Sequence, residues 1–374
     1  MAGGRSYANC GVADNGVNYP LDQPTYYQAL RTAGYQVAGV GKFDLHKASL
    51  DWGLDGSRLL ADWGFTAGID NEGKLDGSRS YQQSGGPQGP YLAYLHERDL
   101  AESYCQEHAQ RRQYQDAYTT ALPDEAYCDN WLAENGLDFL RNFPADQPWH
   151  LVINFVGPHN PMDVTASMRR AWEEVAFPPP HHNHQADYSP QDQQRNRQNY
   201  AAMIENIDRQ VGRFIDLVRR RGELDNTLIV YASDHGEMLG DHSRWGKSTW
   251  QQSAIGVPLI IAGPGVQSGQ ASEALVSLHD LAATFIDYAG ADPWPEMEAR
   301  SLRPLLAGGT NTHRDHIISA LHDWQAILDG RYKLIHQVDS PPRLFDLQAD
   351  PLEETNIAPQ HPEIVNRLQQ LSLW

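Results

Sequence analysis

A long amphipathic helix, followed at once by short apolar strands, is the feature that most limits the fold of this chain. In residues 196–221, apolar side chains recur at the i, i+3, i+4 and i+7 spacing of one helix face. The runs Thr227–Ala232 and Val257–Ala262 are short, apolar and bounded by turn residues, so they predict strands. A second helix is expected over residues 278–289. This alternation predicts a mainly parallel α/β sheet flanked by helices.

Two upstream stretches extend the same pattern. A helix is predicted to start after Thr25, because Gln28 three residues later completes a capping box. The strand Val37–Val40 follows it, and Leu151–Val156 is short enough to be a strand buried on both faces. Residues 178–199 are rich in proline, histidine and side-chain amides, and they predict a long polar loop.

The pattern changes near residue 314. Two strands joined by a tight Asp-Gly turn are predicted within residues 325–336, and residues 343–347 predict another strand. Consecutive strands joined by short turns form antiparallel sheets. We therefore expect an α/β domain over residues 1–313 and a small C-terminal α+β domain, built on an antiparallel sheet, over residues 314–374.

Composition excludes several classes of partner. The chain has 48 acidic and 29 basic residues, a formal net charge of −19, which opposes binding to nucleic acid or to anionic membranes. No run approaches the roughly 18 apolar residues of a membrane span. The three cysteines, Cys10, Cys105 and Cys128, suit neither a disulfide framework nor a zinc site. Neither the compartment nor the oligomeric state follows from the sequence.

Polar residues follow three of the predicted strands directly. Lys42 comes after the strand 37–40, His159 after the strand 151–156, and Asp234 with His235 after the strand 227–232. In an open α/β sheet, ligands bind beyond the carboxyl ends of the strands. We therefore expect these side chains from distant parts of the chain to meet in one crevice.

These residue types could bind a metal cation and an anionic substrate. Asp234 and His235 offer a carboxylate and an imidazole to one metal ion, although a capping aspartate in an ordinary loop is the alternative. The imidazole shifts the expectation from calcium toward manganese or another borderline metal. Lys42 and Lys247 would place positive charge on the oxygens of a tetrahedral ester, unless they are ordinary surface lysines.

Histidines provide the candidate acids and bases. His159, stiffened by prolines on both sides, is the stronger candidate for protonating a leaving alkoxide. If residues 42–46 are extended, His46 projects to the same side as Lys42 and could act as an acid or base. A hydrogen-bonded structural histidine is the alternative for each. His181, His182 and His184 could bind metal, but a solvated loop is the favoured interpretation.

Taken together, these residues resemble the sulfatase branch of the alkaline phosphatase superfamily. The resemblance covers nearly the whole chain, and it rests on several motifs: Gly41-Lys42, Gly157-Pro158-His159-Asn160-Pro161, Ser233-Asp234-His235-Gly236, Gly246-Lys247, Asp329-Gly330-Arg331-Tyr332-Lys333 and Leu344-Phe345-Asp346-Leu347. It implies an alkaline phosphatase-like α/β domain with a small C-terminal antiparallel sheet. It also implies a divalent metal and the hydrolysis of a sulfate ester.

The resemblance assigns roles residue by residue. Lys42 matches the family lysine that contacts the sulfate and the nucleophile, and Lys247 matches the second sulfate lysine. His159 matches the histidine that binds the sulfate or the leaving group. Asp234 and His235 match a metal-ligand pair, for which the family implies calcium, with manganese or magnesium as alternatives. This Asp-His pair looks more like the corresponding pair in the branch that contains choline sulfatases and phosphonate monoester hydrolases.

Two departures from the family pattern concern the nucleophile and a histidine. Asp44 stands where the family commonly has histidine, so His46 is considered as a substitute. The Cys/Ser-x-Pro-x-Arg signature, whose first residue becomes formylglycine, is absent, as is an earlier pair of aspartates. Cys10 does not match the signature. Residues 1–5 resemble the segment just after it, so we expect that the α/β domain lacks its N-terminal strand and nucleophile segment.

The leading hypothesis is therefore a sulfuric ester hydrolase whose formylglycine lies outside these residues, so that the chain as written is inactive. The substrate would be a small-molecule or carbohydrate sulfate ester. Trp52, Trp63 and Trp245 could stack on a sugar, with core packing as the alternative. A phosphonate monoester or phosphodiester hydrolase is a second hypothesis. A non-catalytic sulfatase-like binding protein is the third.

Overall fold

A short parallel sheet forms the centre of the molecule. The structure, a computed structural model, describes residues 1–111, 116–183 and 188–373. Strands β1 (Gln36–Gly41), β2 (Ala67–Asp70) and β4 (Trp149–Asn154) are parallel and lie in the order β2-β1-β4. Strands β6 (Ile229–Ala232) and β7 (Leu259–Ala262) form a separate antiparallel pair. The predicted α/β class is confirmed, although β7 runs against β6.

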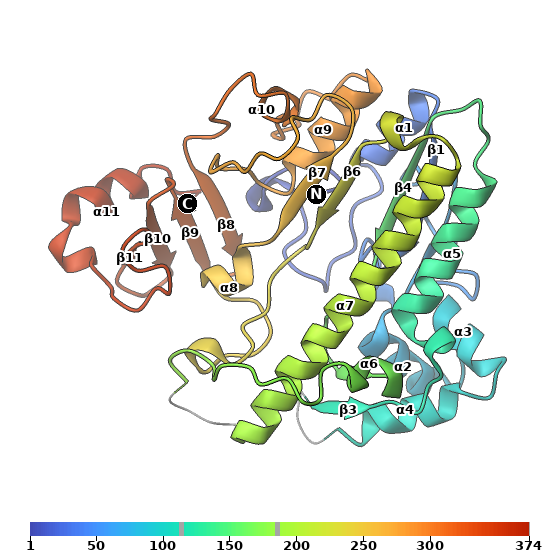
Figure 1. Cartoon of the computed structure of the whole chain (residues 1–374). Coiled ribbons are helices and arrows are strands. Elements are labelled where there is room, and N and C mark those ends of the chain that lie inside the picture. The colour runs from blue at the N-terminus through green and yellow to red at the C-terminus, as the bar shows by residue number, and fades with distance from the viewer. Residues whose placement is uncertain (112–115, 184–187, 374) are drawn as a thin grey trace.

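Helices cover both faces of the central sheet (Figure 1). Val37 of β1 packs with helices α1 (Tyr26–Thr32) and α9 (Asp280–Ala289). Val40 packs with α5 (Cys128–Asn142), which lies beside the long helix α7 (Pro190–Arg220). The remaining elements of this part are α2 (Lys74–Ser84), α3 (Pro90–His96), α4 (Ala101–Ala109), β3 (Ala117–Thr119), β5 (Met162–Val164), α6 (Ala166–Arg170), α8 (Gln252–Ile255) and α10 (Arg303–Leu306).

The C-terminal part is a four-stranded antiparallel sheet in the order β11-β10-β9-β8. Its strands are β8 (Ile317–Leu321), β9 (Trp324–Leu328), β10 (Tyr332–Gln337) and β11 (Arg343–Asp346), and helix α11 (Pro362–Gln369) packs on it. The expected hairpin within residues 325–336 is confirmed. Strand β8 and helix α11 were not predicted.

Capping side chains decide where two of the helices begin. Thr25 and Gln28 form both hydrogen bonds of the predicted capping box at the start of α1. Helix α7 starts at Pro190, because Ser189 accepts a hydrogen bond from the Asp192 N–H and proline fits the first helical turn. The predicted polar loop up to residue 199 is therefore wrong in its second half, since capping outweighs polar composition.

A cavity of about 1540 Å³ lies between β4 and β6. Every residue from Asp146 to Asn160 and from Asn226 to Glu237 lines it. Within the described residues, β4 pairs only with β1, and β6 pairs only with β7, so each strand turns one unpaired edge to the cavity. The side chains of β4 are consequently half-buried, and the prediction that this strand is buried on both faces is wrong.

Two findings concern the surface and the cysteines. Within the described residues, no helix combines the length and the apolar character needed to cross a bilayer. Cys10, Cys105 and Cys128 all lie in described segments and are free thiols, with Cys105 and Cys128 buried.

His108 of α4 gives a prediction for acid stability. It is 5% exposed, neither ring nitrogen bonds to a described residue, and burial lowers its pKa to about 4. In the unfolded chain this histidine takes up a proton below a pH of about 6.5. The free energy of unfolding is therefore unaffected by His108 protonation above this pH, and it decreases as the pH falls toward 4. At about pH 5 the loss should be about 2 kcal/mol of unfolding free energy.

Urea unfolding of the wild type and of His108→Phe at about pH 7 and about pH 5 measures this loss. The variant should lose less stability on acidification than the wild type, because phenylalanine cannot take up the proton. An equal loss in the two proteins would contradict the buried neutral imidazole.

Candidate active site

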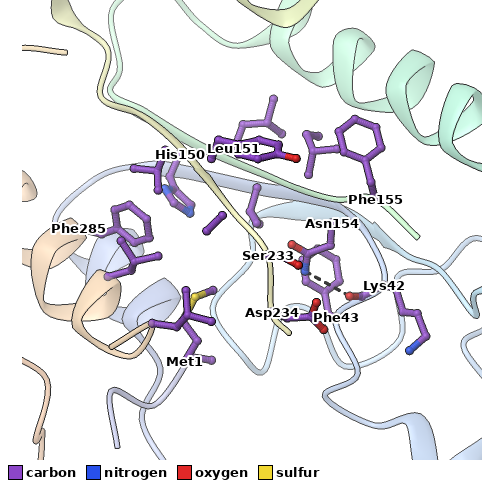
Figure 2. Close-up of a pocket in the computed structure, with 18 of the residues that line it drawn as sticks. Met1, Lys42, Phe43, His150, Leu151, Asn154, Phe155, Ser233, Asp234 and Phe285 are labelled. Atoms are coloured by element: carbon purple, nitrogen blue, oxygen red, sulfur yellow. Dashed lines mark hydrogen bonds between the residues drawn. The ribbon is translucent and has the colours of Figure 1, made fainter. Parts of the chain in front are cut away.

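The ends of three strands meet at one end of the cavity. Lys42 follows β1, His159 follows β4, and Asp234 with His235 follows β6, and all four line the cavity as the sequence predicts. Figure 2 shows Lys42, Asn154 and Asp234 gathered there. The Asn154 amide donates a hydrogen bond of 3.2 Å to the Lys42 carbonyl, so neighbouring strand ends are tied together.

The Lys247 ammonium lies between His159 and His235. Its Nζ lies 3.2 Å from Nε2 of His159 and 2.6 Å from Nε2 of His235. The Nδ1 atom of each ring lies 2.8 Å from a backbone carbonyl, that of Asn160 for His159 and that of Gly236 for His235. Since a carbonyl accepts, Nδ1 carries the hydrogen in both rings, and Nε2 offers its lone pair to the ammonium group.

Burial and positive charge keep both imidazoles neutral. Burial lowers the pKa of His159 to about 3, and the Lys247 charge acts in the same direction. Burial also lowers the pKa of His235, while Asp234 opposes the shift. A neutral imidazole with Nε2 directed into the cavity can accept a hydrogen bond or bind a metal ion.

The Lys42 ammonium forms an ion pair with the carboxylate of Asp44. Its Nζ lies 2.7 and 2.6 Å from the two carboxylate oxygens of Asp44. Burial opposes ionisation of Asp44, but Lys42 and Lys47 outweigh it and lower the pKa of the carboxyl. An incoming anion must therefore compete with Asp44 for the Lys42 ammonium.

His46 does not join the other candidates. Residues 42–46 are not extended, because Asp44 has a φ of 56°, so the expected projection of His46 beside Lys42 is wrong. Its Nε2 lies 3.2 Å from the Asp51 carbonyl, and the ring packs near Trp52 and Trp63. Both tryptophans are almost fully buried, so these three side chains belong to the core.

Two carboxylates that the sequence did not single out hold the loops of the site. Asp129 accepts the N–H groups of Val156 at 2.7 Å and Gly157 at 3.1 Å, just before His159. Glu237 accepts the N–H of Gly246 at 2.6 Å, just before Lys247. Asp129 stands in the first turn of α5, where acidic residues are common, so nothing in the sequence marks this contact.

Removing the Asp129 carboxylate is expected to destabilise the fold. In Asp129→Ala, the buried N–H of Val156 would lose its acceptor at a cost of about 1–3 kcal/mol, and the partly buried N–H of Gly157 would add a smaller cost. Denaturant unfolding should report a loss of that size, and Asp129→Asn should lose less because its amide oxygen can still accept one bond. A change below about 0.5 kcal/mol in Asp129→Ala would show that the loop does not depend on this side chain.

Comparison with known proteins identifies the family. The model of the family described as "Sulfatase" matches residues 1–291. The chain belongs to the sulfatase family. A second model, described as "N-sulphoglucosamine sulphohydrolase, C-terminal", matches residues 240–372. The two models overlap across Lys247 and together span the central and the C-terminal sheets.

Sulfatases are also among the similar curated proteins. The chain is 30% identical to a choline-sulfatase of Rhizobium meliloti (strain 1021), with 93% of this chain and 69% of that protein covered. It is 26% identical to an arylsulfatase of Clostridium perfringens (strain 13 / Type A), with 65% of this chain and 56% of that protein covered. The chain thus spans only part of the length of these sulfatases.

Solved structures give the same fold. The phosphonate monoester hydrolase of Agrobacterium radiobacter superposes with a TM-score of 0.79 at 23% identity, over 99% of this chain and 83% of that one. BT4656, in complex with its substrate D-glucosamine-2-N,6-O-disulfate, has a TM-score of 0.76 at 20% identity, over 99% and 85% of the two chains. These similarities show that the sulfatase-family chain shares its fold with both proteins.

The described residues do not complete a metal site at Asp234 and His235. The Asp234 side chain is 84% exposed, with its carboxylate 3.5 Å from Nε2 of His235, and that nitrogen also receives the Lys247 hydrogen bond. Within the described residues, no third carboxylate, thiol or imidazole joins this pair. Hard cations take about six or more ligands. The divalent cation, whether calcium, manganese or magnesium, therefore stays a prediction that needs further donors.

Proposed function

We propose that the protein is a sulfuric ester hydrolase and that the strand ends beside the cavity bind the sulfate group. The observation that carries the proposal is the position of Lys247, whose ammonium lies within hydrogen-bonding distance of two neutral imidazoles, one after β4 and one after β6. Family membership supports the same chemistry. The substrate would be a small-molecule or carbohydrate sulfate ester.

Each side chain acts on the sulfate or on the leaving oxygen. Lys247 and Lys42 approach from different loops, and their charges would offset the negative charge on the sulfate oxygens as the S–O bond breaks. His159 faces Lys247 through Nε2, and a bound anion favours the protonated form of its imidazole, so it would assist departure of the alcohol. Asp44 would release Lys42 to the incoming sulfate.

The nucleophile would come from polypeptide outside these 374 residues. The formylglycine signature is absent from the sequence, and the cavity between β4 and β6 opens directly onto Lys42, His159 and Asp234. An extended segment could pair with the free edges of both strands and place a reactive group beside these residues. On this proposal, the 374 residues alone bind the anion but do not turn it over.

Sequencing the coding DNA before the Met1 codon, followed by assays of the extended protein, tests this proposal. An in-frame Cys/Ser-x-Pro-x-Arg motif should appear, and the extended protein should hydrolyse 4-nitrophenyl sulfate while residues 1–374 do not. A stop codon directly before Met1 would contradict a nucleophile on the same chain. Sulfate turnover by residues 1–374 alone would contradict the need for an added segment.

A second activity has its own support. The fold similarity is high to a phosphonate monoester hydrolase, and a multifunctional alkaline phosphatase superfamily protein of Trinickia caryophylli is 26% identical over 67% of this chain. Lysines suit a phosphonate as well as a sulfate. Parallel assays of the extended protein with 4-nitrophenyl sulfate and 4-nitrophenyl phenylphosphonate separate the two. Binding of both anions with turnover of neither would favour a non-catalytic sulfatase-like protein.

A further inference from the structure

His181, His182 and Glu354 bring three metal-binding atoms together outside the candidate active site. Nε2 of His182 lies 2.8 Å from Oε1 of Glu354, and Nε2 of His181 contacts the same oxygen. The three ligand atoms lie within 4.8 Å of one another, and no other such group of imidazoles, thiols or carboxylates occurs among the described residues. None of the three residues lines the cavity between β4 and β6.

The backbone places the two imidazoles side by side. Neighbouring residues of an extended chain point in opposite directions. His182 instead has a φ of 48°, and its ring centroid lies 4.4 Å from that of His181. The His181 N–H donates to Asp241 at 2.8 Å, and the His181 carbonyl accepts the N–H of His242 at 2.8 Å. A left-handed backbone outside glycine costs free energy, and such strain is concentrated at functional sites.

Hydrogen bonding does not account for the position of His181. Its Nε2 atom is shielded from solvent and, although it touches Glu354, it makes no hydrogen bond to any described residue. Two imidazole nitrogens directed at one carboxylate oxygen are better matched to a cation among them than to two hydrogen bonds. The geometry therefore favours a bound ion over a network of neutral side chains.

We propose that His181, His182 and Glu354 bind a divalent transition-metal ion of the Zn²⁺ class. Two imidazoles and one carboxylate are a donor set of zinc, whereas calcium and magnesium prefer oxygen ligands alone. The side chains are between 34% and 39% exposed, so water can complete the coordination. His184, which the sequence also suggested as a ligand, lies outside the described residues.

The ion would join two distant segments of the chain. His181 and His182 belong to the loop before α7, and Glu354 belongs to the loop after β11 of the C-terminal sheet. Asp241, which holds the His181 backbone, precedes Lys247 in the loop that follows β6. Metal binding would therefore stiffen a wall of the candidate active site. The site does not depend on the proposed hydrolase activity.

Calorimetric titration of the metal-stripped protein with ZnCl₂ tests the proposal. The titrations use the Asp234→Ala/His235→Ala background, so that any binding there is removed. We expect one Zn²⁺ per chain, and an affinity at least about tenfold lower in Glu354→Gln and in His181→Ala/His182→Ala. Cobalt substitution should give the absorption of a four-coordinate ion, and this absorption should be lost in the same variants.

One matched substitution controls for non-specific binding. His361→Ala removes an exposed imidazole that pairs with Glu363 away from the three proposed ligands. This variant should bind Zn²⁺ as the background protein does. Zinc should also slow hydrogen exchange in residues 180–183 and 350–355 together. The proposed site would be overturned if all variants bound Zn²⁺ with equal affinity or if the background protein bound none. It would also be overturned if Zn²⁺ slowed hydrogen exchange only outside residues 180–183 and 350–355.

Discussion

Replacing Lys247 by methionine is expected to lower kcat/KM for a sulfate ester by about 10²–10³-fold in a form of the protein that carries the nucleophile. The ammonium of Lys247 is directed at the point that His159 and His235 share, and methionine keeps the bulk of the side chain without its charge. Steady-state kinetics with 4-nitrophenyl sulfate measure the loss. In residues 1–374 alone, the same substitution should weaken binding of inorganic sulfate in a calorimetric titration.

Lys47→Met is the matched control for this prediction. Lys47 carries the same charge near the same cavity, but its ammonium pairs with Asp76 at 3.0 Å. Its removal should change kcat/KM by less than about tenfold, because its charge is already paired with Asp76. Equal losses in the two variants would mean that only the overall potential of the cavity matters. No loss in Lys247→Met would remove Lys247 from the proposed site.

Replacing Lys74 by methionine should destabilise the protein by about 3–5 kcal/mol, the cost of breaking a buried ion pair. The Lys74 Nζ lies 2.7 Å from Asp163 and 3.0 Å from the Tyr127 hydroxyl, and the charged side chains are each 1% exposed. Burial opposes the charge on Lys74, but Asp163 outweighs it and raises the pKa of the lysine. Without Lys74, the Asp163 carboxylate would stay buried without its countercharge.

Guanidinium unfolding of Lys74→Met, compared with Arg213→Met, measures this effect. Arg213 pairs with Glu134 at the surface, where both side chains are well exposed, so its loss should cost at most about 1 kcal/mol. Replacing Lys74 and Asp163 together by apolar residues should restore part of the stability, because no unpaired charge remains. Similar losses in the two single variants would contradict a buried charge pair.

Local sequence signals predicted the elements whose causes lie within a few residues. The Thr25–Gln28 capping box, the apolar face of α7 and the hairpin of β9 and β10 were all readable, because each depends on neighbours in the chain. The start of α7 at Pro190 was missed, although Ser189 and Asp192 mark it. There the polar composition was given more weight than the capping residues.

The candidate site residues also divide into those that the local sequence predicted and those that it did not. Lys42, His159 and Asp234 could be grouped from sequence, because each follows a predicted strand of an α/β fold, in which ligands bind beyond the strand ends. The position of the His46 ring could not be predicted, because the positive φ of Asp44 turns the backbone and the ring then packs in the core. Asp129 could not be recognised either, since its role depends on backbone groups on another element.

The sequence by itself determined the family, the alternation of strands and helices, and the residues that follow each strand. Only the tertiary structure showed that Lys247 contacts His159, 88 residues away, directly, and that Glu354 meets the two histidines of the loop before α7. It also revealed that, in the part of the chain that the structure describes, β4 and β6 each turn an unpaired edge to a cavity. Caps and periodicity act between chain neighbours, whereas these contacts depend on how separate elements pack, which no local pattern specifies.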